Sequence, residues 1–248
     1  AGKKVLVTKP WAMNSREADI IIETTKKNNG LVMPWLPLHW GNDLMKLKEI
    51  IASGKIGSIF HIQRSQYTFG KRSDWQVVKK YGGGYLFNWG PHLVGVLLDL
   101  LGEPITQVYS DKKQIINPGD TEDMFYAMMK SKSGVLVNVE HNINTDFLPN
   151  WVVRGTKGTI YVTGKEIEIH EVSYPKQQDP NAYRSAYNVD KNKVTFDKLY
   201  NTYDIYSHIA KVVKDEIPYE ISMDFSRHMT EIIDAIHKSA DEGKMINL

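Results

Sequence analysis

The sequence predicts an α+β protein in which a short strand–helix–strand unit precedes one large, mostly antiparallel β-sheet with helices on one face. Three observations support this fold class: an apolar strand pattern on each side of an early helix, a succession of short strand patterns joined by glycine turns, and amphipathic helices at the end. The chain has 248 residues, 42% of them hydrophobic, so it can bury a core without covalent cross-links. It contains no cysteine, which excludes disulfides and thiolate metal sites.

The first unit is predicted from its apolar runs and its caps. Residues 5–7 form a short apolar run typical of a buried strand. Asn14 and Glu17 have the spacing of a capping box, which predicts the start of a helix that ends near Gly30. A second apolar run, 31–33, follows at once, so the unit is βαβ and its two strands are expected to be parallel.

The middle of the chain alternates between helix and loop patterns. An apolar stripe predicts a helix over 44–51, and residues 56–66 alternate as in a strand. Residues 71–90 are rich in glycine and aromatic rings, as is typical of a loop. An apolar helix is predicted over 93–101, with Gly102 as its cap.

Several consecutive hairpins then predict the large sheet. Its strands are expected at residues 106–110, 124–130, 135–142, 151–154, 159–162 and 166–170. Residues 171–200 are polar and weakly patterned, which favours a long excursion over the surface. Two helices are predicted to close the chain, the second one after Ser222.

Charge and hydropathy limit the class of partner. The 31 basic and 29 acidic residues nearly balance, without the clustered lysines and arginines that nucleic acid requires. The longest apolar runs fall short of the ~20 residues that span a bilayer, so no membrane partner is predicted. No signal-peptide core follows Ala1, which makes the cytoplasm the default location and leaves the periplasm open. Because Ala1 lies so close to the first strand, we expect the sequence to begin inside a domain.

The first candidate for chemistry is Lys9, in the run Thr8-Lys9-Pro10 at the end of the opening strand. Ligands of open α/β sheets bind beyond the carboxyl ends of parallel strands, so this ammonium could meet an oxyanion there. The alternative is a surface lysine that precedes a turn.

The second candidate is the segment from Gly82 to His92. Asn88 and His92 are four residues apart near the predicted start of a helix, so both side chains can face one spot. A helix N-terminus disfavours an imidazolium, which would keep His92 neutral and able to accept a proton. The alternative is a capping asparagine and a packed histidine. The glycines lack the spacing of a dinucleotide fingerprint.

Tryptophans in the loop-like segments are the third candidate, because flat rings suit the C–H faces of a sugar, although they are also ordinary core material. They are Trp35, Trp40, Trp75 and Trp89. The remaining histidines lack metal-ligand spacing, so no metal site is predicted. These are His61, His141, His170, His208, His228 and His237.

In their order along the chain, five segments resemble motifs of the Gfo/Idh/MocA oxidoreductases, named for glucose-fructose oxidoreductase and inositol dehydrogenase. These are residues 1–10, 47–57, 82–102, 154–159 and 232–248. The resemblance implies that residues 1–37 are the last βαβ part of a Rossmann domain. Residues 38–248 would be the substrate-binding and oligomerisation domain.

The resemblance also implies hydride transfer between a sugar or polyol and NAD or NADP, with the glycine-rich turn of the Rossmann domain lying upstream. We therefore expect this chain alone not to bind the cofactor tightly. His92 would be the general base, Lys9 would stabilise the developing alkoxide, and Asn88 would complete the catalytic set. The implied cofactor contacts are Thr8, Lys9 and Pro10, and the implied substrate contacts are Trp35, His39, Trp40, Trp75 and Trp89.

The sequence departs from the family pattern at several motif positions. Asn88 and Gly95 each replace an Asp, Thr8 replaces a Glu, and His39-Trp40 replaces an Arg-aromatic pair. Asn88 cannot ionise or relay a proton. A redox-inactive carbohydrate-binding or assembly module of the same family is therefore an alternative, as is transient oxidation that assists a hydrolysis or elimination. In either case, we expect a homodimer or homotetramer formed through the large sheet.

Overall fold

The computed structural model describes residues 2–174, 181, 183, 184 and 187–248. Strand β1 (Lys4–Thr8), helix α1 (Ser15–Lys27) and strand β2 (Leu31–Trp35) form the first unit, in which β1 and β2 pair in parallel. The Asn14 side chain accepts a hydrogen bond from the Glu17 backbone N–H at 2.9 Å and caps α1, as predicted. β1 was expected to be buried, but Val5 and Leu6 are exposed, at 46% and 38%.

Nine strands form the large sheet, in the order β10-β9-β8-β7-β3-β6-β5-β4-β11. All neighbours pair antiparallel except β3 and β6, which are parallel at the centre. The predicted mostly antiparallel sheet is therefore confirmed. Its strands are β3 (Ile59–Thr68), β4 (Ile105–Lys113), β5 (Met124–Ser131), β6 (Leu136–Ile143), β7 (Trp151–Gly155), β8 (Gly158–Thr163), β9 (Glu166–Ser173), β10 (Asn188–Thr195) and β11 (Ile246–Asn247).

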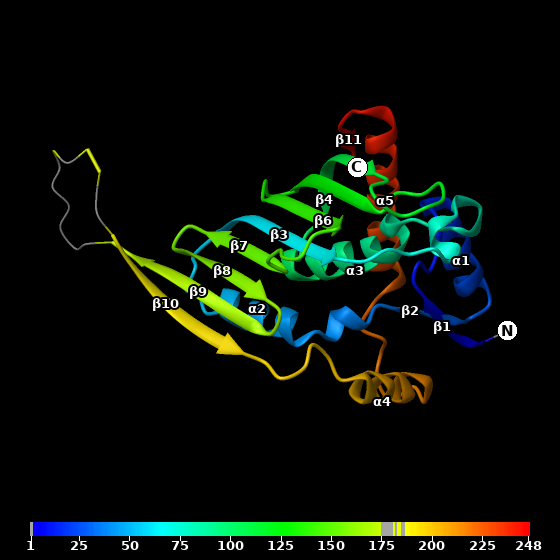
Figure 1. Ribbon diagram of the computed structural model, residues 1–248. Helices are drawn as coiled ribbons and strands as arrows, with labels where there is room; N and C mark the ends of the chain where they lie inside the picture. Colours follow the sequence, from blue (N-terminus) through cyan, green and yellow to red (C-terminus); the bar gives the residue numbers. More distant parts are fainter. Residues whose placement is uncertain (1, 175–180, 182, 185–186) are drawn as a thin grey trace.

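Helices cover one face of this sheet (Figure 1). They are α2 (Asn42–Ala52), α3 (Tyr85–Leu101) and α5 (Met223–Glu242), with short 3₁₀ turns at Pro37–Trp40, Trp75–Val77 and Lys79–Tyr81. The remaining helix, α4, spans Thr202–Val213. α5 packs on β4, α3 and α1, so it joins the first unit to the sheet. α4 lies instead against β2, where Ile205 and Ile209 bury Met33. No helix of the described residues is long and apolar enough to cross a membrane.

α3 differs from its prediction at its first residue. It begins at Tyr85 rather than at Leu93, and Pro91 lies inside it. A distant acceptor explains the earlier start, because the Glu122 carboxylate accepts from the Leu86 N–H at 3.0 Å and its backbone oxygen accepts from the Tyr85 N–H at 3.1 Å. The first turn of α3 is thereby satisfied from outside the helix.

The surface excursion predicted over 171–200 is wrong in part, because it contains strand β10. This edge strand pairs antiparallel with all of β9, and the two extend away from the body of the protein (Figure 1). Backbone hydrogen bonds to β9 hold β10 in place, so its exposed side chains can be polar, as is usual for an edge strand. Residues 175–180, 182, 185 and 186 of the predicted excursion lie outside the described residues.

Candidate functional site

The end of β1 meets the first turns of α3, and this contact brings together two of the predicted catalytic residues. The Lys9 ammonium donates to the backbone oxygen of Asn88 at 2.6 Å and also to its side-chain oxygen. The Asn88 amide in turn donates to the Gln76 side-chain oxygen at 2.8 Å. Asn88 is therefore oriented from both sides, with its oxygen toward a cation and its NH₂ toward an acceptor.

Burial and, to a smaller extent, the nearby positive charge of Arg72 lower the pKa of Lys9 to about 8. Lys9 and Asn88 line a small cavity of about 130 Å³ together with Pro10, Trp75 and Gln76. Such a lysine is a cation at neutral pH that can also lose its proton in mildly basic solution. The arrangement suits the stabilisation of a negative oxygen.

His92 lies one turn further along α3 and lines a different cavity, of about 470 Å³. The ring of Trp89 meets it edge-on with centroids 5.7 Å apart. Burial lowers the pKa of His92 to about 3, helped by the charges of Lys9 and Arg64. Nδ1 is buried without a hydrogen-bond partner, which leaves Nε2 as the nitrogen available to a ligand.

A helix N-terminus was the expected cause of a neutral His92. The neutral state agrees with the structure, but its expected cause is wrong. His92 lies in the middle of α3, where the helix dipole acts weakly, and burial suppresses its charge instead. The alternative reading of Asn88 as a cap is also wrong, since Gly84 occupies the N-cap position.

Arg64 lines the same cavity as His92 and was missed by the sequence analysis. Its side chain comes from β3, is 3% exposed and lies over the Trp151 ring, 4.9 Å from the centroid. The Trp151 indole N–H donates to Asp43 at 2.9 Å, and the Asp43 carboxylate lines the cavity too. Burial lowers the pKa of Arg64 to about 10, while the charge of Asp43 raises it. The missed signal was spacing, because Arg64 follows the buried Ile62 by two residues and so shares its inward face.

The other predicted contacts are dispersed. Trp35 stacks on Tyr206 of α4 with centroids 5.2 Å apart, and Trp40 lies against Tyr219. The His39 Nδ1 lies 3.0 Å from the Asp99 carboxylate. Neither of the two cavities described above is lined by Trp35, His39 or Trp40. Thr8 pairs with Trp35 in the βαβ unit.

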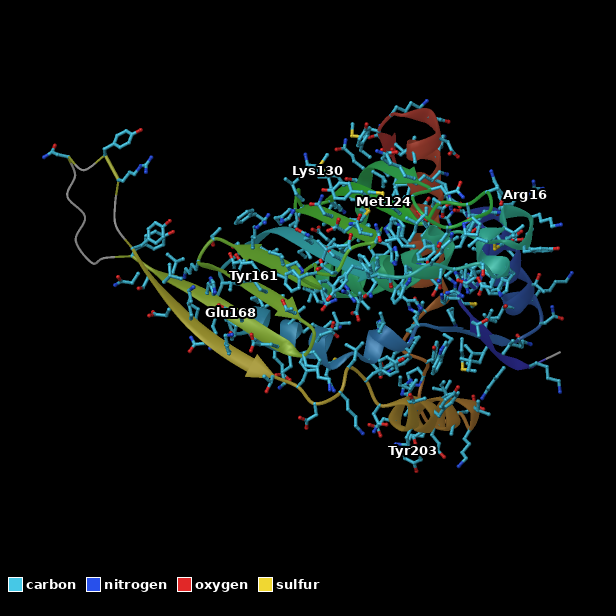
Figure 2. All side chains as sticks on the ribbon, in the orientation of Figure 1. Arg16, Met124, Lys130, Tyr161, Glu168 and Tyr203 are labelled. Carbon is cyan, nitrogen blue, oxygen red and sulfur yellow. The ribbon has the colours of Figure 1, made fainter. Side chains whose placement is uncertain are left out.

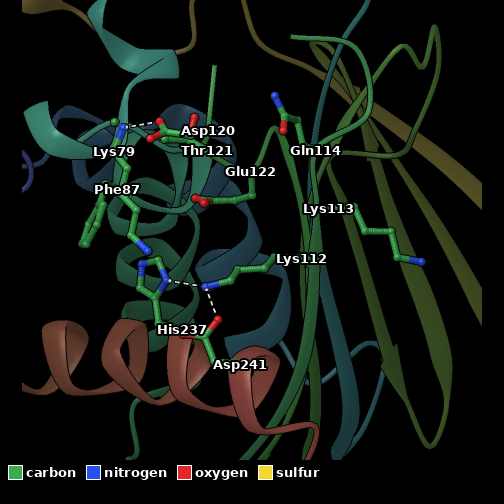
Figure 3. A pocket seen from close by; sticks show the side chains of 11 residues that line it. Lys79, Phe87, Lys112, Lys113, Gln114, Asp120, Thr121, Glu122, His237 and Asp241 are labelled. Carbon is green, nitrogen blue, oxygen red and sulfur yellow. Dashed lines mark hydrogen bonds and ion pairs between the residues drawn. The ribbon is translucent and has the colours of Figure 1, made fainter. Parts of the chain in front are cut away.

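A third cavity, of about 420 Å³, lies between α3, α5 and β4 (Figure 3). The Lys112 ammonium contacts His237 Nδ1 at 3.2 Å and the Asp241 carboxylate at 2.8 Å. Burial lowers the pKa of His237 to about 4, with the Lys112 charge adding to the effect. The Lys112 charge is therefore already balanced by Asp241, and the cavity holds a closed ion-pair cluster.

The described residues offer neither a metal site nor a pyrophosphate cradle at the end of β1. The described residues contain no cluster of three or more histidines and carboxylates that could hold a metal ion. The connection between β1 and α1, residues 9–14, has no glycine, so it lacks the backbone cradle that binds a pyrophosphate in the first turn of a dinucleotide-binding domain. Among the described residues of this connection, Lys9 could meet the reacting end of a nicotinamide cofactor.

Comparison with known proteins finds a family model that matches part of this chain, and relatives among oxidoreductases. Residues 44–161 match the GFO/IDH/MocA C-terminal domain. An uncharacterized oxidoreductase of Schizosaccharomyces pombe is 24% identical over all of this chain and 76% of its own length. The scyllo-inositol 2-dehydrogenase (NADP⁺) IolW of Bacillus subtilis is 20% identical over all of this chain and 73% of its own length.

The fold has solved counterparts as well. An NAD-binding protein from Listeria innocua superposes with a TM-score of 0.81 at 21% identity, covering 99% of this chain and 75% of that protein. The likeness confirms the predicted fold class. Through residues 44–161, the chain is thus similar to the C-terminal domain of the GFO/IDH/MocA family.

Proposed function

We propose that these residues form the substrate side of an NAD(P)-dependent oxidoreductase that acts on a secondary alcohol of a sugar or polyol. One observation carries the proposal: a half-buried, neutral imidazole, that of His92, lines a cavity of about 470 Å³ beside the Trp89 ring. The volume lies in the range of small-molecule sites. The name of the Bacillus subtilis relative, an inositol dehydrogenase, supports a polyol substrate.

The proposed reaction breaks the C–H and O–H bonds of the carbinol. A bound nicotinamide cofactor, with Lys9 near its reacting end, would supply the acceptor for the hydride and its electron pair; His92 Nε2 would take the hydroxyl proton, which leaves a carbonyl. The Lys9 cation lies close enough to lower the pKa of His92, and it would stabilise negative charge that develops on the oxygen. Trp89 would offer a ring face to the substrate.

Cofactor binding by these 248 residues alone is expected to be weak, because the β1–α1 connection has no glycine cradle. Titration calorimetry with NAD and with NADP measures this. A dissociation constant in the low micromolar range would contradict the expectation and would place a complete dinucleotide site within the chain.

The function itself is tested with the intact polypeptide that carries these 248 residues. We expect a panel of sugars and polyols to include one that reduces NAD or NADP, followed by absorbance at 340 nm. His92→Ala should lose at least 100-fold in kcat, the scale of general-base catalysis (roughly 10²–10⁴-fold). His170→Ala, which removes a histidine paired with Glu168 on β9, is the matched control and should keep full activity. Unchanged turnover in His92→Ala would overturn the assignment.

A second candidate function is a redox-inactive carbohydrate-binding or assembly module. It is favoured by one observation: Lys9 and Asn88 line one cavity and His92 lines another, so the three do not surround a single space. Binding of a sugar with no turnover in wild-type protein, together with turnover gained in Asn88→Asp, would support this candidate.

For the assembly, we propose a homodimer or homotetramer that forms through the face of the large sheet opposite the helices. The support is the set of apolar side chains exposed on that face, in β4, β5 and β6. An exposed apolar patch on a sheet typically marks an interface.

A further inference from the structure

Arg64 lines the cavity that contains His92, and one edge of its guanidinium makes no hydrogen bond to the described residues. Both of its hydrogen bonds leave from Nη1, to the Ser65 backbone oxygen at 2.8 Å and to the Asn150 backbone oxygen at 2.9 Å. Nε is buried without a partner, and Nη2 makes no hydrogen bond to any residue that the structure describes. An unpaired charged donor in a buried site is costly, so a missing acceptor is indicated.

Asp43 does not fill this role. Its carboxylate accepts the Trp151 indole N–H at 2.9 Å and forms no ion pair with Arg64 within the described part of the chain. Its charge acts on Arg64 at longer range and keeps the guanidinium protonated. The protein thus balances the charge of Arg64 while leaving its Nε and Nη2 donors free.

Nε and Nη2 together form the side of a guanidinium that matches the two oxygens of a carboxylate. Lys165 lines the same cavity and adds a second positive charge. We propose that the substrate of this cavity is a polyhydroxy acid, of the uronic or aldonic class, whose carboxylate pairs with the Nε–Nη2 edge of Arg64. The inference rests on the proposed function in taking this cavity as the substrate site.

A bound carboxylate would also act on His92. The positive charge of Arg64 is one of the causes that lower the pKa of His92. An anion on Arg64 cancels part of that charge and raises the pKa of His92, which makes the imidazole a better base. A neutral sugar lacks this effect. An acid substrate would therefore make His92 a stronger base toward the hydroxyl proton of that same substrate.

A phosphate ester offers the same kind of oxygen acceptor, and the carboxylate is favoured for two reasons. Asp43 lies at the same cavity and repels a dianion more strongly than a monoanion. A single planar fork also matches a planar carboxylate better than a tetrahedral phosphate.

The experiment measures binding of three acids to the 248-residue chain by titration calorimetry at pH 7, without cofactor. The acids are D-glucuronate, D-galacturonate and D-gluconate; D-glucuronamide and D-glucose are the neutral probes, and D-glucose 6-phosphate is the dianion. We expect at least one acid to bind about tenfold more tightly than the neutral probes, a difference of about 1.4 kcal/mol. Equal binding of acid and neutral probes, tighter binding of the phosphate, or no binding of any acid would each overturn the proposal.

Variants locate the effect at Arg64. Arg64→Lys keeps the positive charge near Asp43 but loses the fork, and it should lose most of the tenfold preference. Arg154→Lys, an exposed arginine of β7 that contacts His61 Nδ1 at 3.0 Å, is the matched control and should keep the preference. An unchanged preference in Arg64→Lys would contradict the assignment. If that variant does not fold, Lys165→Gln in the same cavity should weaken acid binding severalfold, and no change there would contradict the assignment equally.

A second readout separates this inference from the proposed function. In NMR titrations of the wild-type chain, the bound acid should raise the pKa of His92, whereas D-glucuronamide should not. A preference for acids without turnover of any sugar in the intact polypeptide would support the carboxylate site and contradict the proposed oxidoreductase function. Turnover of neutral sugars without a preference for acids would support the oxidoreductase function and contradict the carboxylate site.

Discussion

Asn88 sets the environment of the Lys9 ammonium, because Lys9 donates to both of its oxygens. In Asn88→Asp, a carboxylate replaces the amide oxygen, and an opposite charge at hydrogen-bond distance favours the protonated lysine. We expect the pKa of Lys9 to rise from about 8 by one unit or more, measured by NMR titration of the lysine side chains.

Asn201→Asp is the matched control for this change. Asn201 caps α4 by accepting from the Tyr203 backbone N–H at 3.2 Å, and an aspartate serves that position equally well. The control adds the same charge away from Lys9 and should leave its pKa near 8. A Lys9 pKa that stays near 8 in Asn88→Asp would show that the contact between Lys9 and residue 88 does not persist in solution.

His141 makes the stability of the protein depend on pH. The residue is fully buried against Tyr85, Trp89 and Phe125, and both ring nitrogens lack hydrogen-bond partners. Burial lowers the pKa of His141 to about 4, although Asp123 opposes the shift. Between pH 6.5 and 4 the unfolded chain binds a proton that the folded protein excludes. The free energy of unfolding therefore falls as the pH is lowered through this window, by at most about 1.4 kcal/mol per pH unit from this residue.

The measurement compares urea unfolding at pH 7 and pH 5 in wild-type protein and in His141→Phe. A phenylalanine suits the aromatic surroundings and cannot be protonated, so the loss of stability between the two pH values should be smaller in the variant. His170→Phe on β9 should behave as wild type. Identical losses in wild type and His141→Phe would assign the pH dependence to other groups, such as His92.

At the scale of single elements, α3 shows what the sequence could and could not predict. Its apolar stripe and its terminal Gly102 predicted the helix and its end. Its start could not be predicted, because Gly90 and Pro91 are typical of a break and the acceptor that satisfies the first turn, Glu122, is distant in sequence. A contact across the fold therefore overrides the local signal.

The candidate site shows the same limit. Lys9 and His92 could be found because they stand in recognisable motifs, although no spacing predicted that they line separate cavities. Arg64 could not be chosen by residue type, because arginine in a strand normally faces solvent. Its partner Trp151 and the nearby Asp43 come from other elements, so only the packed structure shows why a guanidinium can remain inside.

Glu122 is predicted to support the N-terminus of α3. Glu122→Ala removes the acceptor of the Leu86 N–H and should lower the free energy of unfolding by about 1–2 kcal/mol, the usual effect of losing a helix cap. Glu122→Gln keeps an oxygen at the same place and should lose less. Urea unfolding measures both variants, with Glu49→Ala, an exposed residue paired with Lys46, as the control. Equal losses in Glu122→Ala and Glu49→Ala would contradict the capping role.

At the scale of the whole molecule, the helices leave one face of the nine-stranded sheet uncovered. Large apolar side chains are exposed there on three adjacent strands, β4, β5 and β6. They are Tyr109 (46% exposed), Tyr126 (39%), Met128 (47%) and Leu136 (47%). The register pairs Tyr109 with Met128 directly, so these side chains form one surface rather than isolated exposures.

If a second copy covers this surface, a charge at its centre should prevent assembly. Met128→Glu places a carboxylate in the proposed interface, where the burial of an unpaired charge is costly. The variant should therefore be a monomer in sedimentation velocity at protein concentrations on the order of tens of micromolar. Tyr203→Glu is the matched control, since Tyr203 is 78% exposed on α4 and projects away from the sheet (Figure 2). It should leave the oligomer intact. A wild-type protein that sediments as a monomer over this range, or an oligomer that survives Met128→Glu, would show that the open face is not where copies of this chain meet.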